Sequence, residues 1–287
     1  MATNDAGAGV PAVVAPAPGR EPGRTGSARS NAALLAYVLH RYDWSETSLI
    51  VELFTRERGR LVVVAKGAKR PTSNFRPVLL PFQPLHALLG KTPADDHAEV
   101  LNLRGAEWAG GQPLLPAAAL LSGFYLNELL LKLLARQDPH ASLFDAYADT
   151  LAALARAEDE ASVLRAFELM LLREVGVLPD LSLATLSAQA LQSSARYTLQ
   201  AEAGVLPSAQ GLAGAHWVAL EAALSHGSGS ALRQACVPAA AGLRGPLREL
   251  LHYHLGSAKL RTRQVWQGVQ KLSTPAPKAP HEPIHRP

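Results

Sequence analysis

Along residues 33–111, short apolar runs separated by turn residues predict β-strands. The first three runs are "LLAYVLHRYD", "TSLIVELFTRERG" and "RLVVVAKGAKR", and Gly59 supplies the positive φ of a hairpin between the last two. A fourth run, "NFRPVLLPFQPLHALLG", is interrupted by Pro77, Pro81 and Pro84, and "AEVLNLRGAEWA" is a fifth. Five short strands in about 80 residues predict a small barrel of the OB-fold type.

From Leu115 onward the spacing of apolar residues becomes helical. Pro116 suits a first helical position, and Phe124, Leu131 and Leu134 recur on one side of the expected helix. Further helices are expected at 143–156, 160–175, 213–225, 229–236, 246–256 and 262–271, whereas residues 177–208 are ambiguous. The fold class predicted is therefore α+β and multidomain, with an N-terminal OB-fold β-barrel followed by an all-helical C-terminal domain.

The two ends of the chain differ from this pattern. Residues 1–31 are rich in Ala, Gly and Pro with few large apolar side chains, which predicts a disordered extension. The Pro-rich residues 273–287 predict a disordered tail for the same reason. The expected domains between them are the barrel at 32–112 and the helical domain at 113–272.

Positive charge is concentrated in two segments although the net charge is only +4. Seven basic residues lie between Arg56 and Arg76 against one acid, Glu57, and six follow from Lys259 against Glu282. Such local excess indicates a binding surface for an anionic partner. The residues expected to contact nucleic-acid phosphates are Arg56, Arg58, Arg60, Lys66, Lys69, Arg70 and Arg76, with Lys259, Arg261 and Arg263 as a second patch.

Aromatic residues accompany the first basic segment. Indole and phenyl rings can stack on bases, and each stacked base contributes roughly 1–3 kcal/mol. The candidates for this role are Trp44 and Phe75. Phe82 and Trp108 are expected in the core. The combination favours single-stranded nucleic acid over the alternative of an ordinary solvated basic surface.

No arrangement of residues predicts catalysis or a cofactor. The chain has no phosphate-binding loop, no G-x-S-x-G and no H-E-x-x-H. Asp95 and Asp96 would suit a metal-dependent nuclease, but they lie in a polar loop, and His252 and His254 would not face each other on a helix. One cysteine, Cys236, excludes an intramolecular disulfide and a cysteine-built zinc site. We therefore expect neither an enzyme nor a metal.

Neither the N-terminus nor the most apolar segment of the sequence indicates a membrane protein. The N-terminus lacks the features of a signal peptide. The segment from Leu114 to Leu134 contains Asn127, Glu128 and Lys132, which predicts a buried helix rather than a membrane span. A cytoplasmic protein is expected.

Four stretches of the sequence resemble the RecO family of bacterial DNA repair proteins. They are "VLHRYDWSETSLIVELFTRERGRLVVVAKGAKRP" (38–71), "FYLNELLLKLLARQDPHASLFDAYADTLAAL" (124–154), "LRAFELMLLREVGVLPDL" (164–181) and "HYHLGSAKLRTRQVW" (252–266). The first is the most specific, because S-E-T-S-L precedes a basic hairpin and A-K-G-A-K-R.

The resemblance implies a recombination mediator with an OB-fold and a helical domain. Such a protein binds single- and double-stranded DNA and anneals complementary strands without ATP. It works with RecR to load RecA, and it binds the C-terminal tail of single-stranded DNA-binding protein. A nucleoid-associated location in the cytoplasm follows. Many family members carry a four-cysteine zinc site after the "GVLPDL" stretch, but residues 177–208 contain no cysteine, so we predict no zinc.

The partner tail is acidic and apolar, so its site requires an apolar wall with cations. The expected wall comprises Phe124, Tyr125, Leu129, Lys132 and Arg136. The alternative is a plain core helix in which Glu128 and Lys132 form an i,i+4 pair. The alternative for the whole protein is an OB-fold adaptor that binds protein partners through the basic hairpin without itself binding DNA.

Overall fold

The computed structural model describes residues 33–90, 100–111, 113–256, 260–262 and 265. The expected disordered extension and Pro-rich tail lie outside these residues. The same holds for Asp95, Asp96, Lys259 and Arg263.

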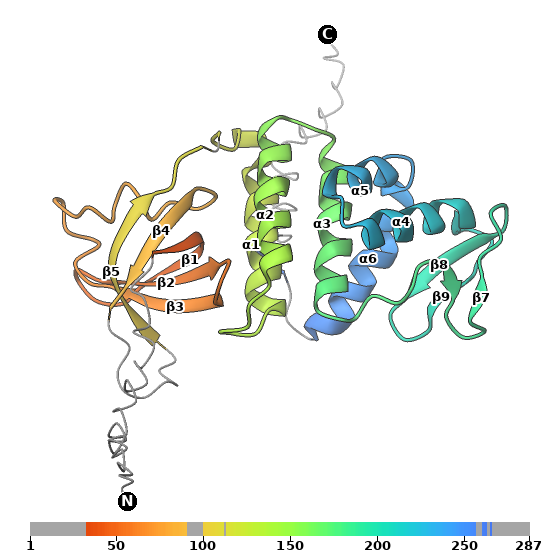
Figure 1. Cartoon of the computed structure of the whole chain (residues 1–287), viewed down its shortest axis with the longest axis horizontal. Helices are drawn as coiled ribbons and strands as arrows, with labels where there is room; N and C mark the ends of the chain where they lie inside the picture. Colours follow the sequence, from red (N-terminus) through yellow and green to blue (C-terminus); the bar gives the residue numbers. More distant parts are fainter. Residues whose placement is uncertain (1–32, 91–99, 112, 257–259, 263–264, 266–287) are drawn as a thin grey trace, which may run out of the picture. The chain divides into compact units, whose positions relative to one another are not determined.

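Five strands form a closed barrel in the order β1-β2-β3-β5-β4 (Figure 1). Their bounds are β1 Leu34–Asp43, β2 Leu49–Thr55, β3 Gly59–Ala65, β4 Pro84–Leu89 and β5 Val100–Trp108. Neighbouring strands are antiparallel except β3 and β5, which pair in parallel. The predicted five-stranded barrel is confirmed, and its arrangement is consistent with an OB-fold.

Inward-facing side chains of all five strands fill the barrel. Ala36, Val51, Leu61, Leu85 and Leu103 are each no more than 3% exposed. The turns that follow β3 cover one end of the barrel and insert further apolar side chains into it.

Two aromatic residues were expected in the core, and the structure separates them. Phe82 is buried, at 4% exposure, as predicted. Trp108 is 62% exposed, so its expected core position was wrong. It is the last residue of β5, and its backbone still pairs with Leu85 of β4.

Most of the helix expected at 262–271 lies outside the described residues. The other helices lie close to the predicted places, although the last begins at Ala240 rather than at 246. They are the short 3-10 helix η1 (Ala117–Ala119), then α1 Leu120–Leu133, α2 Ala141–Ala155, α3 Glu160–Glu174, α4 Gly214–His226, α5 Gly229–Cys236 and α6 Ala240–Leu255. The N-cap of α3 is Asp159, whose carboxylate accepts the N–H of Ser162 at 2.9 Å. Within the described part of the chain, every helix falls short of the length and apolar character that crossing a membrane requires.

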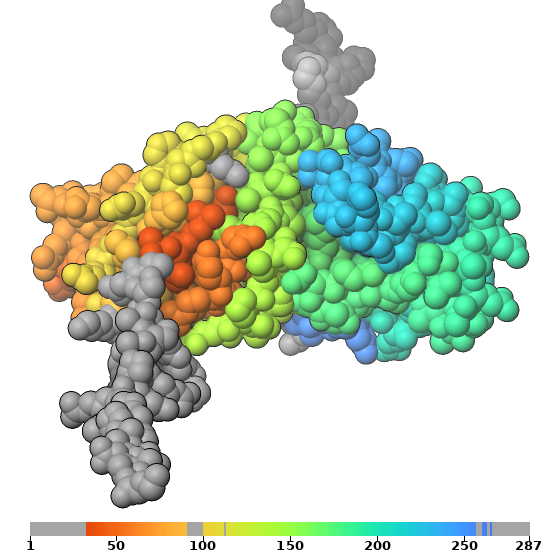
Figure 2. Space-filling model, in the orientation of Figure 1, coloured from red at the N-terminus to blue at the C-terminus, as the bar shows by residue number. Residues whose placement is uncertain are grey.

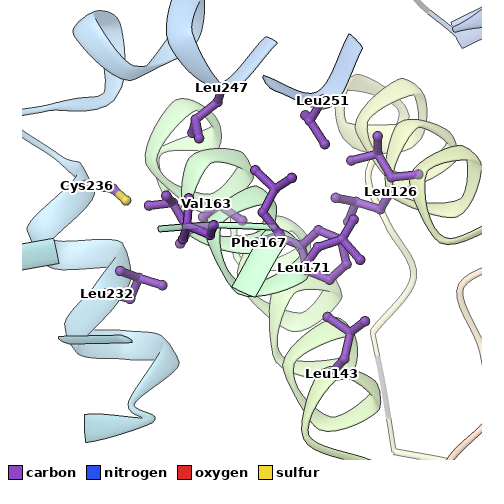
Figure 3. Packing of buried hydrophobic residues seen from close by; sticks show 14 of the residues in the cluster. Leu126, Leu143, Val163, Phe167, Leu171, Leu232, Cys236, Leu247 and Leu251 are labelled. Carbon is purple, nitrogen blue, oxygen red and sulfur yellow. The ribbon is translucent and has the colours of Figure 1, made fainter. Parts of the chain in front are cut away.

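Helix α3 lies at the centre of the helical core (Figure 3). Figure 3 shows Phe167 of α3 among side chains from α1, α2, α5 and α6. The labelled neighbours are Leu126, Leu143, Val163, Leu171, Leu232, Cys236, Leu247 and Leu251. This arrangement explains why the α3 sequence carries apolar residues on several sides.

The expectation of an all-helical second domain is corrected by residues 183–213, which form short strands. The strands are β6 Leu183–Ala184, β7 Gln189–Ala190, β8 Arg196–Gln200, β9 Gly204–Pro207 and β10 Leu212–Ala213. They make a sheet of order β10-β8-β9 and a separate β6–β7 pair. Trp217 of α4 is completely buried and donates from its indole to the carbonyl of Tyr197 at 3.1 Å. Strands this short are fixed by packing, so the sequence pattern did not predict them.

The barrel and the helices share one apolar core. Tyr37 and Phe54, on β1 and β2, pack against Phe144 of α2 with ring centroids 5.3 Å apart in both pairs. Buried Asn127 of α1 donates to the carbonyl of Leu39 at 3.0 Å. The space-filling view shows the strands of the barrel in continuous contact with the first helices (Figure 2).

The β2–β3 hairpin adds a second connection to the helices. Gly59 has φ +66°, as predicted for its turn, and a Cβ added there would lie 1.8 Å from the carbonyl oxygen of Asp138. The N–H of Gln137 donates to the carbonyl of Arg60 at 2.9 Å. The hairpin tip is therefore packed against the connection between α1 and α2.

Candidate nucleic-acid interface

Cations at the tip of the β2–β3 hairpin are bound by carboxylates of the same chain. The guanidinium of Arg56 donates two hydrogen bonds of 2.9 Å to Asp145 of α2, and these bonds raise the pKa of Arg56. Arg60 donates at 3.2 Å to buried Glu52, which also accepts from Arg136 at 3.3 Å. Asp145 compensates the charge of Arg56, whereas Arg60 and Arg136 share the single carboxylate of Glu52. The contacts of Arg56 and Arg136 hold the hairpin to the helices.

Arg58 lies between them at the turn. It is partly buried, and its backbone N–H donates to the hydroxyl of Thr55 at 3.1 Å. Its position at the tip separates it from the basic residues that follow β3.

The remaining cations of this segment lie at the other end of β3. Strand β3 is seven residues long, which at a rise of about 3.3 Å per residue places its two ends about 20 Å apart. Lys66, Arg70 and Arg76 are exposed there. Lys69 forms an ion pair of 3.2 Å with Asp43, whose side chain is 82% exposed, so this pair contributes little to stability. One basic segment of the sequence thus becomes two separate groups.

A hollow of about 310 Å³ opens beside the second group, where β1 ends and β2 begins. Its lining residues are Arg41, Leu49, Ala68, Lys69, Phe75, Arg76 and Leu79. Three of them are cations and none is an acid. Sequence reasoning missed Arg41, because it lies well before the basic segment and is brought to the hollow by the antiparallel pairing of β1 with β2, in which it is opposite Val51.

Both candidate stacking residues lie near this hollow in the fold. Phe75 forms part of its wall, is partly buried, and packs against the barrel core. The N–H of Leu79 donates to the carbonyl of Phe75 at 2.9 Å, which fixes the backbone there. Trp44 is 64% exposed in the loop between β1 and β2. That loop is joined to the wall of the hollow by a hydrogen bond of 2.9 Å from the N–H of Lys69 to the carbonyl of Thr47.

Of the second basic patch, only Arg261 is among the described residues. Its side chain is exposed, and its N–H and that of Thr262 donate to the carboxylate of Glu128 at 2.8 and 3.0 Å. Burial acts to raise the pKa of Glu128, but the hydrogen bonds from Thr262, Arg261 and Lys132 outweigh it, and the pKa lies below its ordinary value. Glu128 therefore anchors the C-terminal segment to α1 as an ionised group.

The charge of Arg261 also reaches the barrel. Partial burial is the main reason that the pKa of His40 on β1 lies below its ordinary value; Glu52 opposes this effect, and Arg261 and Arg41 lower the pKa further. The His40 ring lies 4.4 Å from that of Tyr42, which is 45% exposed. Arg261 is thus near β1.

The wall expected for an acidic partner tail is only partly on the surface. Phe124 is 42% exposed and packs on Phe82 at 4.9 Å between ring centroids. The hydroxyl of Tyr125 donates to buried Glu168 at 2.7 Å. Leu129 is completely buried, so its expected surface position is corrected: it faces the helical core, as the alternative interpretation had it.

The two cations of that wall each contact a carboxylate. Lys132 pairs with Glu128 at 2.9 Å in the expected i,i+4 arrangement, and Arg136 contacts Glu52. No residue of the expected wall lines the hollow on the barrel or a second hollow between the helices.

A second hollow, of about 320 Å³, lies between α2, α3, α4 and α5. Asp145, Asp149 and Glu174 line it, and its one cation, Arg173, is bound by Glu221 at 2.6 Å. An acidic ligand would be repelled from this hollow, so it suits neither a nucleic acid nor an acidic tail.

No three His, Cys, Asp or Glu side chains among the described residues come together in a way that could hold a metal ion. Burial raises the pKa of the Cys236 thiol to about 12, which leaves it unreactive. Residues 177–208 have no cysteine, and Leu181 and Leu199 of this segment are packed in the core instead. A four-cysteine zinc site therefore does not fit this chain.

Comparison with known proteins gives matches over both parts of the chain. Residues 32–104 match the family described as Recombination protein O N terminal, and residues 117–264 match Recombination protein O C terminal. The chain is similar to the DNA repair protein RecO of Variovorax paradoxus, with 52% identity over 251 residues, and to that of Acidovorax ebreus, with 51% identity over 255 residues. Each alignment covers 83% of this chain and 96% of the relative.

Proposed function

This chain belongs to the RecO family of DNA repair proteins, which gives it a general role in recombinational repair, and we propose that it is a recombination mediator that binds and anneals DNA. In this proposal it binds single- and double-stranded DNA and anneals complementary strands without ATP. It then helps RecR to load RecA onto DNA covered by single-stranded DNA-binding protein, whose C-terminal tail it engages. These steps place it at the nucleoid in the cytoplasm.

The observation that carries the proposal is the basic surface at the end of the barrel. Five cations gather there against two acids, Asp43 and Glu46, both of which are exposed. The cations are Arg41, Lys66, Lys69, Arg70 and Arg76. OB-folds bind nucleic acid on the β2–β3 face and with the β1–β2 and β4–β5 loops, and this surface adjoins the first of these loops.

The physical task in annealing is to bring two polyanions together. Lysine and arginine contacts lower the repulsion between phosphates and release counterions, so binding weakens as salt is raised. Exposed rings such as Trp44 hold bases unpaired while a second strand samples its register. None of these steps requires nucleotide hydrolysis.

A salt titration of strand annealing tests the proposal. Complementary fluorescent oligonucleotides are mixed with the wild-type protein in the absence of ATP, and with a variant in which Lys66, Arg70 and Arg76 are changed to Ala. The matched control changes three exposed arginines elsewhere, Arg104, Arg244 and Arg248, to Ala, so that both variants have the same net charge. We expect annealing that weakens with salt, is lost in the first variant and persists in the control.

Other outcomes would redirect the proposal. Equal loss in both triple variants would mean that overall charge, rather than this surface, drives annealing. If the wild type neither binds DNA nor anneals at any salt concentration, the mediator proposal fails and the adaptor alternative gains support. The adaptor alternative expects the basic hairpin to bind an acidic protein surface. It is disfavoured by the ion pairs that already occupy Arg56 and Arg60.

A further inference from the structure

The hollow at the end of the barrel has the chemistry of a site for one nucleotide. It combines apolar side chains, one aromatic ring and three cations within about 310 Å³. That size is at the lower limit of about 300–1,000 Å³ typical of small-molecule sites. We propose that it holds a single unpaired nucleotide of a DNA strand, with the base against Phe75 and the phosphate among Arg41, Lys69 and Arg76. This inference rests on the proposed DNA-binding function and adds to it a selection for unpaired bases.

The cations are arranged for an anion that the described residues do not supply. Within the described ranges, the guanidinium groups of Arg41 and Arg76 take part in no hydrogen bond or ion pair. Among the described residues, the ammonium group of Lys69 is paired with the highly exposed Asp43. Like charges around one hollow repel each other, and a phosphate placed among them relieves that repulsion. The water-exposed Lys69–Asp43 pair gives way to a phosphate at small cost.

The apolar wall is arranged for a planar group. Phe75 is held from behind by the barrel core and through its backbone by Leu79, so its ring loses little freedom when a base binds. Leu49 and Leu79 complete an apolar surface beside it. A base inside a duplex is already stacked on both faces and presents only its edges in the grooves. It cannot enter this hollow unless it leaves the helix, so the site distinguishes unpaired from paired strands.

A neighbouring platform extends the site along a strand. Trp44 is exposed on the β1–β2 loop, and that loop is hydrogen-bonded to Lys69 of the hollow through Thr47. A strand with one base in the hollow can stack a neighbouring base on Trp44. Two adjacent bases would then be kept unpaired at the point where annealing begins.

The test compares the affinities of three ligands by fluorescence anisotropy: a short oligothymidylate, the same oligonucleotide with abasic sites in place of its bases, and a duplex. The main variant is Phe75→Leu, which keeps an apolar side chain against the barrel core but removes the ring. We expect it to weaken oligothymidylate binding about tenfold. Binding of the abasic oligonucleotide and of the duplex should stay unchanged.

A second variant guards against a folding defect at Phe75. Arg41→Gln changes an exposed residue at the rim and should weaken binding of oligothymidylate more than binding of the duplex. Its matched control is Arg104→Gln, an exposed arginine on β5 that does not line the hollow. The control should affect both ligands slightly and equally.

The outcomes separate this inference from the function on which it rests. If Phe75→Leu and Arg41→Gln weaken the binding of all three ligands equally, or of none, while the wild type still binds DNA, the nucleotide site is refuted and the mediator proposal stands. If the wild type binds no DNA, both fail. A last measurement adds free thymidine monophosphate as a competitor of oligothymidylate binding. If it competes at concentrations as low as those of the oligonucleotide, the hollow serves a free nucleotide rather than a strand.

Discussion

Asn127 is expected to be the residue that couples the stability of the barrel to that of the helices. Its amide donates to the carbonyls of Leu39 and Val38 on β1, at 3.0 and 3.4 Å, and its carbonyl oxygen accepts from the hydroxyl of Tyr147 on α2 at 2.6 Å. Asn127 is 2% exposed and Tyr147 is completely buried. Water therefore cannot replace the partners that a substitution removes.

The cost of Asn127→Leu follows from the groups left unpaired. The substitution strands the hydroxyl of Tyr147 and the carbonyl of Leu39, each at roughly 1–3 kcal/mol, with a small gain from the added apolar surface. We expect the free energy of unfolding to fall by about 2–5 kcal/mol. Tyr147→Phe alone should cost about 1–3 kcal/mol, because it removes one donor and leaves the side-chain oxygen of Asn127 without it.

The double variant provides the decisive comparison. Once the hydroxyl of Tyr147 is absent, Asn127→Leu strands one group fewer, so the two effects should fall short of additivity by about 1–2 kcal/mol. Urea denaturation followed by far-UV circular dichroism measures all four proteins. Asn102→Leu, on the exposed side of β5, is the control and should change stability by no more than about 0.5 kcal/mol. Additivity within about 0.3 kcal/mol would refute the argument, because it would show that the two side chains do not interact.

Three further predictions concern the hairpin, the C-terminal anchor and the zinc-free segment. Gly59→Ala should lower Tm in thermal melts more than Gly67→Ala does. Both glycines have positive φ, so either substitution costs roughly 1–2 kcal/mol of backbone strain, but only a side chain at position 59 would also collide with the α1–α2 connection. Equal losses of Tm would contradict this prediction. The lowered pKa of Glu128 adds stability that is present above about pH 4.5 and is lost as the pH falls further. In urea titrations at several pH values, Glu128→Gln should therefore lose less stability on acidification than the wild type. An unchanged pH dependence would contradict this prediction. Dialysis against EDTA should leave Tm unchanged, whereas Trp217→Phe should lower it, since packing holds β8; a lower Tm after EDTA would indicate a structural metal.

Local features of the sequence were sufficient for the elements of the barrel and for most helices. Alternation of apolar residues, the glycine of the hairpin and the proline before α1 act over a few residues, and these elements lie where they were expected. The pair between Glu128 and Lys132 was also predictable, because helix geometry alone places residues four apart together. The strands at 183–213 were not predictable, since strands of two to five residues depend on packing against α4 and the core.

The candidate site divides along the same line. The sequence by itself determined that cations are concentrated around β3 and that aromatic residues accompany them, because charge and ring type belong to each residue alone. Only the tertiary structure decided which cations remain available. Arg56 is paired with a carboxylate 89 residues away, whereas Arg41 is brought to the hollow by strand pairing, and neither contact leaves a mark in the local sequence. Ion pairs and hollows depend on which distant segments meet, and that is settled by the packing of the barrel against the helices.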